Sequence, residues 1–89
     1  MITYIAFSKE RDWIEFGGFG ACYALAQEFC QVNPDRVAYI GQVRGGEYNG
    51  RYIFEFTADS PPTQLSPPKF FDADKFRRVY AIKVSSRDE

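Results

Sequence analysis

Residues 21–32 read ACYALAQEFCQV, and this stretch decides the fold because the period of the chain changes there from that of a strand to that of a helix. It is rich in helix formers and holds neither Gly nor Pro. Gly20 precedes it, and Asn33-Pro34 ends it. At 3.6 residues per turn, one apolar stripe is predicted to be the buried face, formed by Cys22, Leu25, Ala26, Phe29 and Val32.

The opposite face of this helix carries almost no charge. It holds Tyr23, Ala24, Gln27 and Gln31, with Glu28 near its edge. Solvated helix faces usually carry more charge, so we expect this face to be partly covered by the chain itself or by a partner.

The segments around the helix have the alternation and the β-branched and aromatic residues of strands. We expect strands over residues 2–7, 13–16, 37–43, 52–57 and 79–85. Residues 44–50 are predicted to form a hairpin connection in which Asn49-Gly50 supplies the positive φ angles. On the strand that follows, Tyr52, Phe54 and Phe56 alternate, so all three are expected on the face under the helix.

Prolines dominate residues 59–68, which contain Pro61-Pro62 and Pro67-Pro68. This composition excludes a helix or a central strand and predicts an extended surface loop, with a ligand for an aromatic groove as the alternative. Residues 69–76 are ambiguous, with a helical turn beginning at Asp72. The expected fold is a single α+β domain over residues 1–89, in which one main helix packs on an antiparallel four- or five-stranded sheet.

Composition narrows the class of protein. The net charge of −1 is neither the basic footprint of a strong nucleic-acid binder nor the acidic excess of a nucleic-acid mimic. The apolar start lacks a basic region before it, so we expect a cytoplasmic protein with no membrane partner, in the host cytoplasm if it is phage-encoded. Cys22 and Cys30 are about 12 Å apart along one helix, too far for a disulfide, so they are predicted to be reduced, buried thiols.

The sequence contains no clear catalytic or metal-binding motif. The chain has no histidine, and no serine stands in a nucleophile motif. The run Gly17-Gly18-Phe19-Gly20 favours a tight turn over an anion cradle, and Asp72-Ala73-Asp74 favours a helix cap over a metal site. We expect no catalytic, cofactor or metal site and therefore no enzyme.

Two strands invite a comparison with nucleic-acid binders. Residues 50–56 resemble the RNP1 strand of RNA-recognition domains, and residues 4–7 resemble the RNP2 strand. That resemblance implies stacking of bases on sheet aromatics. Two features argue against RNA binding. The net charge is slightly negative, and a proline-rich stretch stands where that family needs a second helix. Single-stranded nucleic-acid binding is therefore kept as the alternative function.

The remaining signal is the aromatic content, since sixteen of the 89 residues are Phe, Tyr or Trp. One helix covers one face of such a sheet, so the surplus is predicted to bind a partner. The leading hypothesis is a non-enzymatic protein-binding module, in its narrower form a phage or mobile-element inhibitor of the anti-CRISPR type that occludes a larger host complex. A homodimer that buries the surplus is a further possibility. The contact surface is expected on the sheet face away from the helix or on the uncharged helix face. The candidate partner-binding residues are Trp13, Phe19, Tyr23, Tyr48, Arg51, Phe70 and Phe71.

Overall fold

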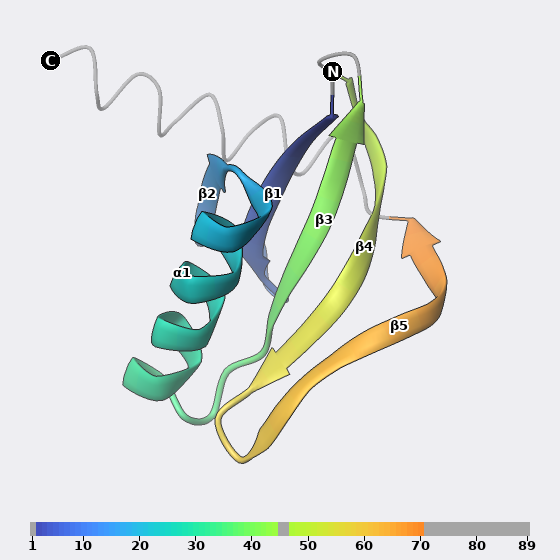
Figure 1. The fold of residues 1–89 in the computed structure, drawn as a ribbon. Coiled ribbons are helices and arrows are strands. Elements are labelled where there is room, and N and C mark those ends of the chain that lie inside the picture. Colours follow the sequence, from blue (N-terminus) through green and yellow to red (C-terminus); the bar gives the residue numbers. More distant parts are fainter. Residues whose placement is uncertain (1, 45–46, 71–89) are drawn as a thin grey trace, which may run out of the picture.

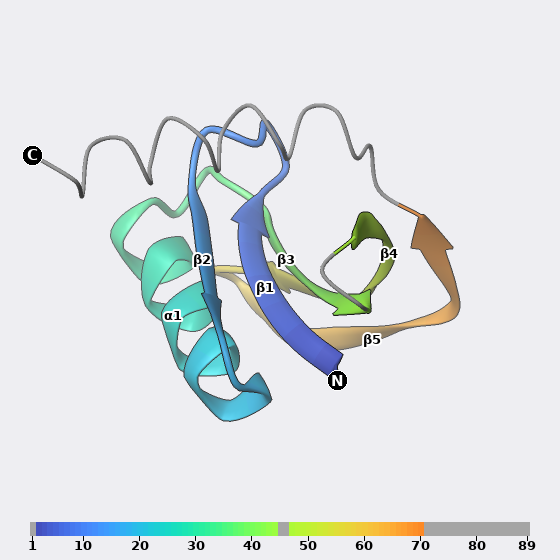
Figure 2. The same ribbon diagram turned by 90° about the horizontal axis from the view of Figure 1, so that it is seen from above.

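The computed structural model describes residues 2–44 and 47–70, in which one helix packs on a five-stranded sheet (Figure 1). The elements in chain order are β1 (Ile2–Ser8), β2 (Ile14–Gly17), α1 (Phe19–Val32), β3 (Ala38–Arg44), β4 (Glu47–Thr57) and β5 (Ser60–Phe70). The strand order is β2-β1-β3-β4-β5, and each strand is antiparallel to its neighbours. Figure 2 shows α1 on one side of this sheet and β5 at the edge away from β2. The predicted two-layer α+β fold is confirmed. The helical turn predicted at Asp72 and the strand predicted over residues 79–85 lie outside the described residues.

Small side chains set the contact between α1 and the sheet. Cys22, Ala26 and Cys30 recur every four residues and are at most 1% exposed. They pack with Ala6, Ala38, Ile40 and Phe56 of the sheet. Because the helix side chains that face the sheet are small, the helix backbone can approach the strands closely, and the bulkier helix residues lie to either side of this line.

The buried face of α1 is therefore centred on Cys22, Ala26 and Cys30 and differs from the predicted stripe. Leu25 and Phe29 are half-buried, and Val32 is 71% exposed. The prediction that Val32 belongs to the core is wrong, because the small residues Cys22 and Ala26 lie over the middle of the sheet and leave Val32 at its margin.

A bulge in β4 breaks the expected aromatic alternation. Ile40 pairs with Phe54, but the next residue of β3, Gly41, pairs with Tyr52, so Ile53 is an extra residue in β4. An extra residue turns the side chains beyond it to the other face. Phe54 and Phe56 pack on the helix side, as expected, whereas the prediction for Tyr52 is wrong.

The sheet face away from α1 has an apolar cluster of its own. Ile5, Phe7, Ile14 and Tyr39 are each at most 9% exposed there. Tyr52 joins them, with its ring centroid 4.6 Å from that of Tyr39 and 6.1 Å from that of Phe7. This sheet is consequently apolar on both faces.

The proline-rich segment forms the edge strand β5, so the prediction of a loop is wrong. The residues of β5 that pair with β4 are Ser60, Thr63, Gln64, Lys69 and Phe70, none of them a proline. An edge strand tolerates proline because one side of it makes no ladder hydrogen bonds. The predicted hairpin is also displaced, because Asn49-Gly50 lies inside β4.

Candidate functional site

A groove opens beside the C-terminal half of α1. Its volume is about 220 Å³, and we call it the α1 groove. Its lining residues are Trp13, Leu25, Glu28, Phe29, Val32 and Asn33. All of them except Trp13 belong to the last turns of α1 or to its C-cap.

The turn between β1 and β2 positions Trp13 at this groove. The Ser8 amide donates to the Trp13 carbonyl at 3.0 Å, and the Arg11 amide donates to the Ser8 carbonyl at 2.9 Å. Arg11 adopts a φ of 67°, which reverses the chain within this turn. The buried Ser8 hydroxyl accepts from the Trp13 amide at 3.1 Å and donates to Asp12 at 2.6 Å. Hydrogen bonds to both the N–H and the carbonyl of Trp13 thus fix the backbone of this residue.

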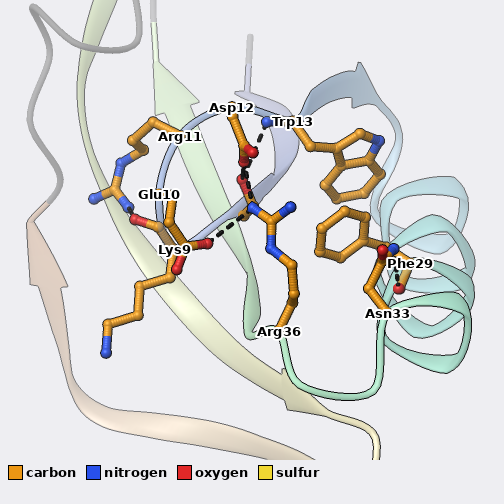
Figure 3. Close-up of polar contacts among 9 residues, drawn as sticks. Lys9, Glu10, Arg11, Asp12, Trp13, Phe29, Asn33 and Arg36 are labelled. Atoms are coloured by element: carbon orange, nitrogen blue, oxygen red, sulfur yellow. Dashed lines mark hydrogen bonds and ion pairs between the residues drawn. The ribbon is translucent and has the colours of Figure 1, made fainter.

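Aromatic stacking fixes the Trp13 side chain. Its ring centroid lies 4.4 Å from that of Phe29, with 14° between the ring planes. The guanidinium carbon of Arg36 lies 5.1 Å from the Phe29 centroid (Figure 3). Asn33 closes the helix beneath them, because its side-chain amide and its backbone N–H each donate to the Phe29 carbonyl at 2.9 Å. The groove wall is therefore preorganised by contacts from three parts of the chain.

An ion cluster borders this wall. Arg36 donates to Glu10 at 2.9 Å and also to Asp12 (Figure 3). The hydrogen bonds from Arg36 lower the pKa of both carboxyl groups, and those carboxylates raise the pKa of Arg36 in turn. Two carboxylates share this one guanidinium, while Lys9 and Arg11 of the same turn carry two further positive charges, so this border of the groove is mixed in charge.

Negative charge lies at the end of α1 beside the groove. Among the described residues that line the groove, Glu28 is the charged one, and it takes no part in the ion pairs of Arg36. The exposed Asp35 lies in the turn closed by the Arg36 amide and the Asn33 carbonyl. The last turn of α1 holds no basic residue, so its negative end is not compensated by its own side chains. An apolar floor is thus combined with a negative rim.

The structure separates the predicted partner-binding residues rather than joining them. Trp13 lines the α1 groove, while Phe19 begins α1 at its other end and is 37% exposed. Arg51 and Phe70 pair across β4 and β5, with the guanidinium carbon 5.8 Å from the ring centroid, and Phe70 is 73% exposed.

Tyr23 is partly covered by the sheet. It is half-buried, with its ring centroid 5.0 Å from that of Phe56 and 6.0 Å from that of Phe54. This agrees with the expectation that the chain itself partly covers the helix face with Tyr23, because the line of small residues turns this ring toward β4.

Two further candidates are only partly described or not described. The backbone of Tyr48 lies in β4, but its side chain is outside the described part of the chain. Phe71 is outside it altogether.

Sequence reasoning missed most of the groove. It assigned Leu25, Phe29 and Val32 to the core, and it gave Asn33 only the role of ending the helix. One signal in the sequence could have indicated that Val32 is exposed. It is the last apolar residue before Asn33-Pro34, and the end of a helix can extend beyond the sheet that it covers.

A second, smaller hollow of about 120 Å³ lies beside the uncharged face of α1. It is lined by Gln27, Gln31, Phe56, Thr57, Ala58, Ser60, Pro61 and Pro62. The β4–β5 turn thus borders this helix face, in agreement with the expectation that the chain partly covers it.

Reactive chemistry is not apparent among the described residues. Cys22 and Cys30 are free, buried thiols, as predicted, and burial raises the pKa of Cys22 to about 11 and also raises that of Cys30. A thiol with a raised pKa is a poor nucleophile at neutral pH. Within residues 2–44 and 47–70, no cluster of three His, Cys, Asp or Glu side chains could hold a metal ion.

Comparisons with protein-family models, with curated proteins and with solved structures each give no match. Among the described residues, no helix is long and apolar enough to cross a membrane.

Proposed function

We propose that this protein is a non-enzymatic protein-binding module and that the α1 groove is its main contact surface. The observation that carries the proposal is Val32, which is 71% exposed beside the stacked rings of Trp13 and Phe29. Rigid aromatic side chains within an exposed apolar patch are typical anchors of protein interfaces.

The size of the groove supports a protein ligand. Its volume of about 220 Å³ is below the roughly 300–1,000 Å³ of small-molecule pockets. A space of this size suits one or two side chains that protrude from a partner. The stack and the Ser8 hydrogen bonds fix Trp13 before binding, which lowers the entropy lost on association.

The narrower form of the proposal is an inhibitor from a phage or mobile element, of the anti-CRISPR type, that occludes a larger host complex. Such an inhibitor needs a rigid contact surface and no catalytic group. Its support is the preorganised groove, which meets the first of these needs.

Affinity capture from a host-cell lysate tests the proposal, with Val32→Asp and Gln31→Asp as matched baits. Both positions are exposed neighbours at the end of α1, but Val32 lines the groove and Gln31 does not. We expect the wild-type protein and Gln31→Asp to retain one partner in stoichiometric amount and Val32→Asp to lose it. If none of the three baits retains a stoichiometric partner, the proposed function is wrong.

Nucleic-acid binding gains no specific support from the geometry. Stacking on bases needs exposed rings on the open sheet face, whereas Phe7 is 0% and Tyr39 is 9% exposed there. It is tested by titration of labelled single-stranded RNA and DNA at low salt, where tight binding that weakens steeply with salt would favour it over a protein partner.

A further inference from the structure

We propose that the α1 groove recognises a basic side chain, arginine or lysine, that lies next to an apolar residue on the surface of a protein partner. This inference rests on the proposed function and specifies the chemistry of the partner. It combines two separate properties of the groove, its apolar floor and its negative rim.

The apolar floor fits the stem of a long side chain. Leu25, Val32 and the ring of Trp13 offer carbon surface at the helix margin. Arginine and lysine bury their methylene stems on such surface while their charged ends stay at the rim.

The charge of the rim selects the sign of the ligand. Glu28 lines the groove and takes no part in the ion pairs of Arg36 with Glu10 and Asp12. The C-terminal end of α1, which attracts cations, points to the same region, since Asn33 caps that end and lines the groove. The nearest described cation at the wall, Arg36, is engaged by both Glu10 and Asp12. An acidic ligand would therefore meet like charge, whereas a basic ligand would meet complementary charge.

A second copy of this chain is the competing occupant. The pair Arg51 and Phe70 also places a basic group beside an exposed apolar ring. That surface lies on the edge formed by β4 and β5, so its insertion into the groove would join copies head to tail. Association of this kind would show as a mass that grows with protein concentration.

Two short peptides of equal length provide the probe, one alternating leucine with arginine and the other alternating leucine with glutamate. Each is titrated into the isotopically labelled full-length protein, and the amide and indole N–H resonances are followed by NMR. The variants are Glu28→Gln, Glu28→Lys and the matched control Asp59→Asn, which removes one negative charge from the exposed β4–β5 turn, away from the groove.

The arginine peptide is expected to shift the Trp13 indole resonance and the amides of residues 25–33. Glu28→Gln should weaken its binding by about two- to fivefold, as expected for the loss of one exposed ion pair, and Glu28→Lys should weaken it further. Asp59→Asn should leave it unchanged, and the glutamate peptide should bind at least about tenfold more weakly than the arginine peptide.

Equal shifts from both peptides, shifts centred on Arg51 and Phe70, or no shift at millimolar peptide would each overturn the inference. So would light scattering that shows self-association abolished by Val32→Asp. If the groove fails this test but Val32→Asp still abolishes capture of a partner, the inference is wrong and the proposed function stands.

Discussion

Replacing Ala26 with leucine tests how the helix meets the sheet. Ala26 is 0% exposed and lies in the middle of the line of small residues between Cys22 and Cys30. Leucine adds three carbons where Ala6, Ile40 and Phe56 already fill the interface. Protein interiors are close-packed, so α1 must move away from the sheet or the side chain must leave its preferred rotamer.

The expected cost is about 1–3 kcal/mol of unfolding free energy, the usual range for overpacking a core. For a domain of this size, that loss lowers the Tm by roughly 5–20 °C. The assay is urea and thermal unfolding followed by the fluorescence of Trp13, the single tryptophan, which stacks on the helix residue Phe29.

Ala24→Leu is the matched control, because Ala24 lies on the same helix and is exposed. Alanine and leucine have similar helix propensities, so this change should alter stability by less than about 0.5 kcal/mol. If Ala26→Leu and Ala24→Leu unfold at the same midpoint, the close approach of α1 to the sheet is refuted.

Three further predictions concern the groove wall and the core. Ser8→Ala leaves the Trp13 amide without its hydroxyl acceptor and should cost about 1–2 kcal/mol in urea unfolding, and an unchanged midpoint would contradict that role. Arg36→Gln removes the guanidinium that lowers the pKa of Asp12, so this pKa should rise toward its ordinary value. A carboxyl NMR titration measures it, and an unchanged pKa would show that the ion pair does not form in solution. Burial raises the pKa of Cys22 to about 11 from an ordinary 9.0, so its folded form holds the proton more tightly than its unfolded form. The contribution of Cys22 to stability should thus be constant below about pH 9 and fall by on the order of 2 kcal/mol toward pH 11. The slope of stability against pH in this range should be smaller in Cys22→Ala, and an equal slope would contradict the prediction.

The sequence predicts the two-layer fold because its information is local. The helix follows from the period of residues 21–32, and the antiparallel strands follow from alternation on either side. The burial of Cys22, Ala26 and Cys30 was predicted from the sequence, but the 3.6-residue spacing placed Val32 on the buried stripe as well, and Val32 is exposed.

Features that depend on pairing between distant segments were not predictable in this way. The extra residue Ile53 becomes visible only when β4 is registered against β3, and it moves Tyr52 to the other face. The prolines of β5 exclude a central strand, yet the free edge of β4 accepts them because non-proline residues make the paired contacts. The α1 groove also depends on distant segments, since Trp13 of the β1–β2 turn stacks on Phe29 of α1.

The most direct measurement of the central claim, that the α1 groove is a protein-binding surface, compares the affinity of the captured partner for Val32→Asp and Gln31→Asp. A charge placed on a buried interface anchor should weaken binding at least about tenfold, whereas the same charge one residue away should leave it within about twofold. We expect that difference at Val32, beside Trp13 and Phe29. Equal affinities for the two variants would show that the partner binds elsewhere and would contradict the account.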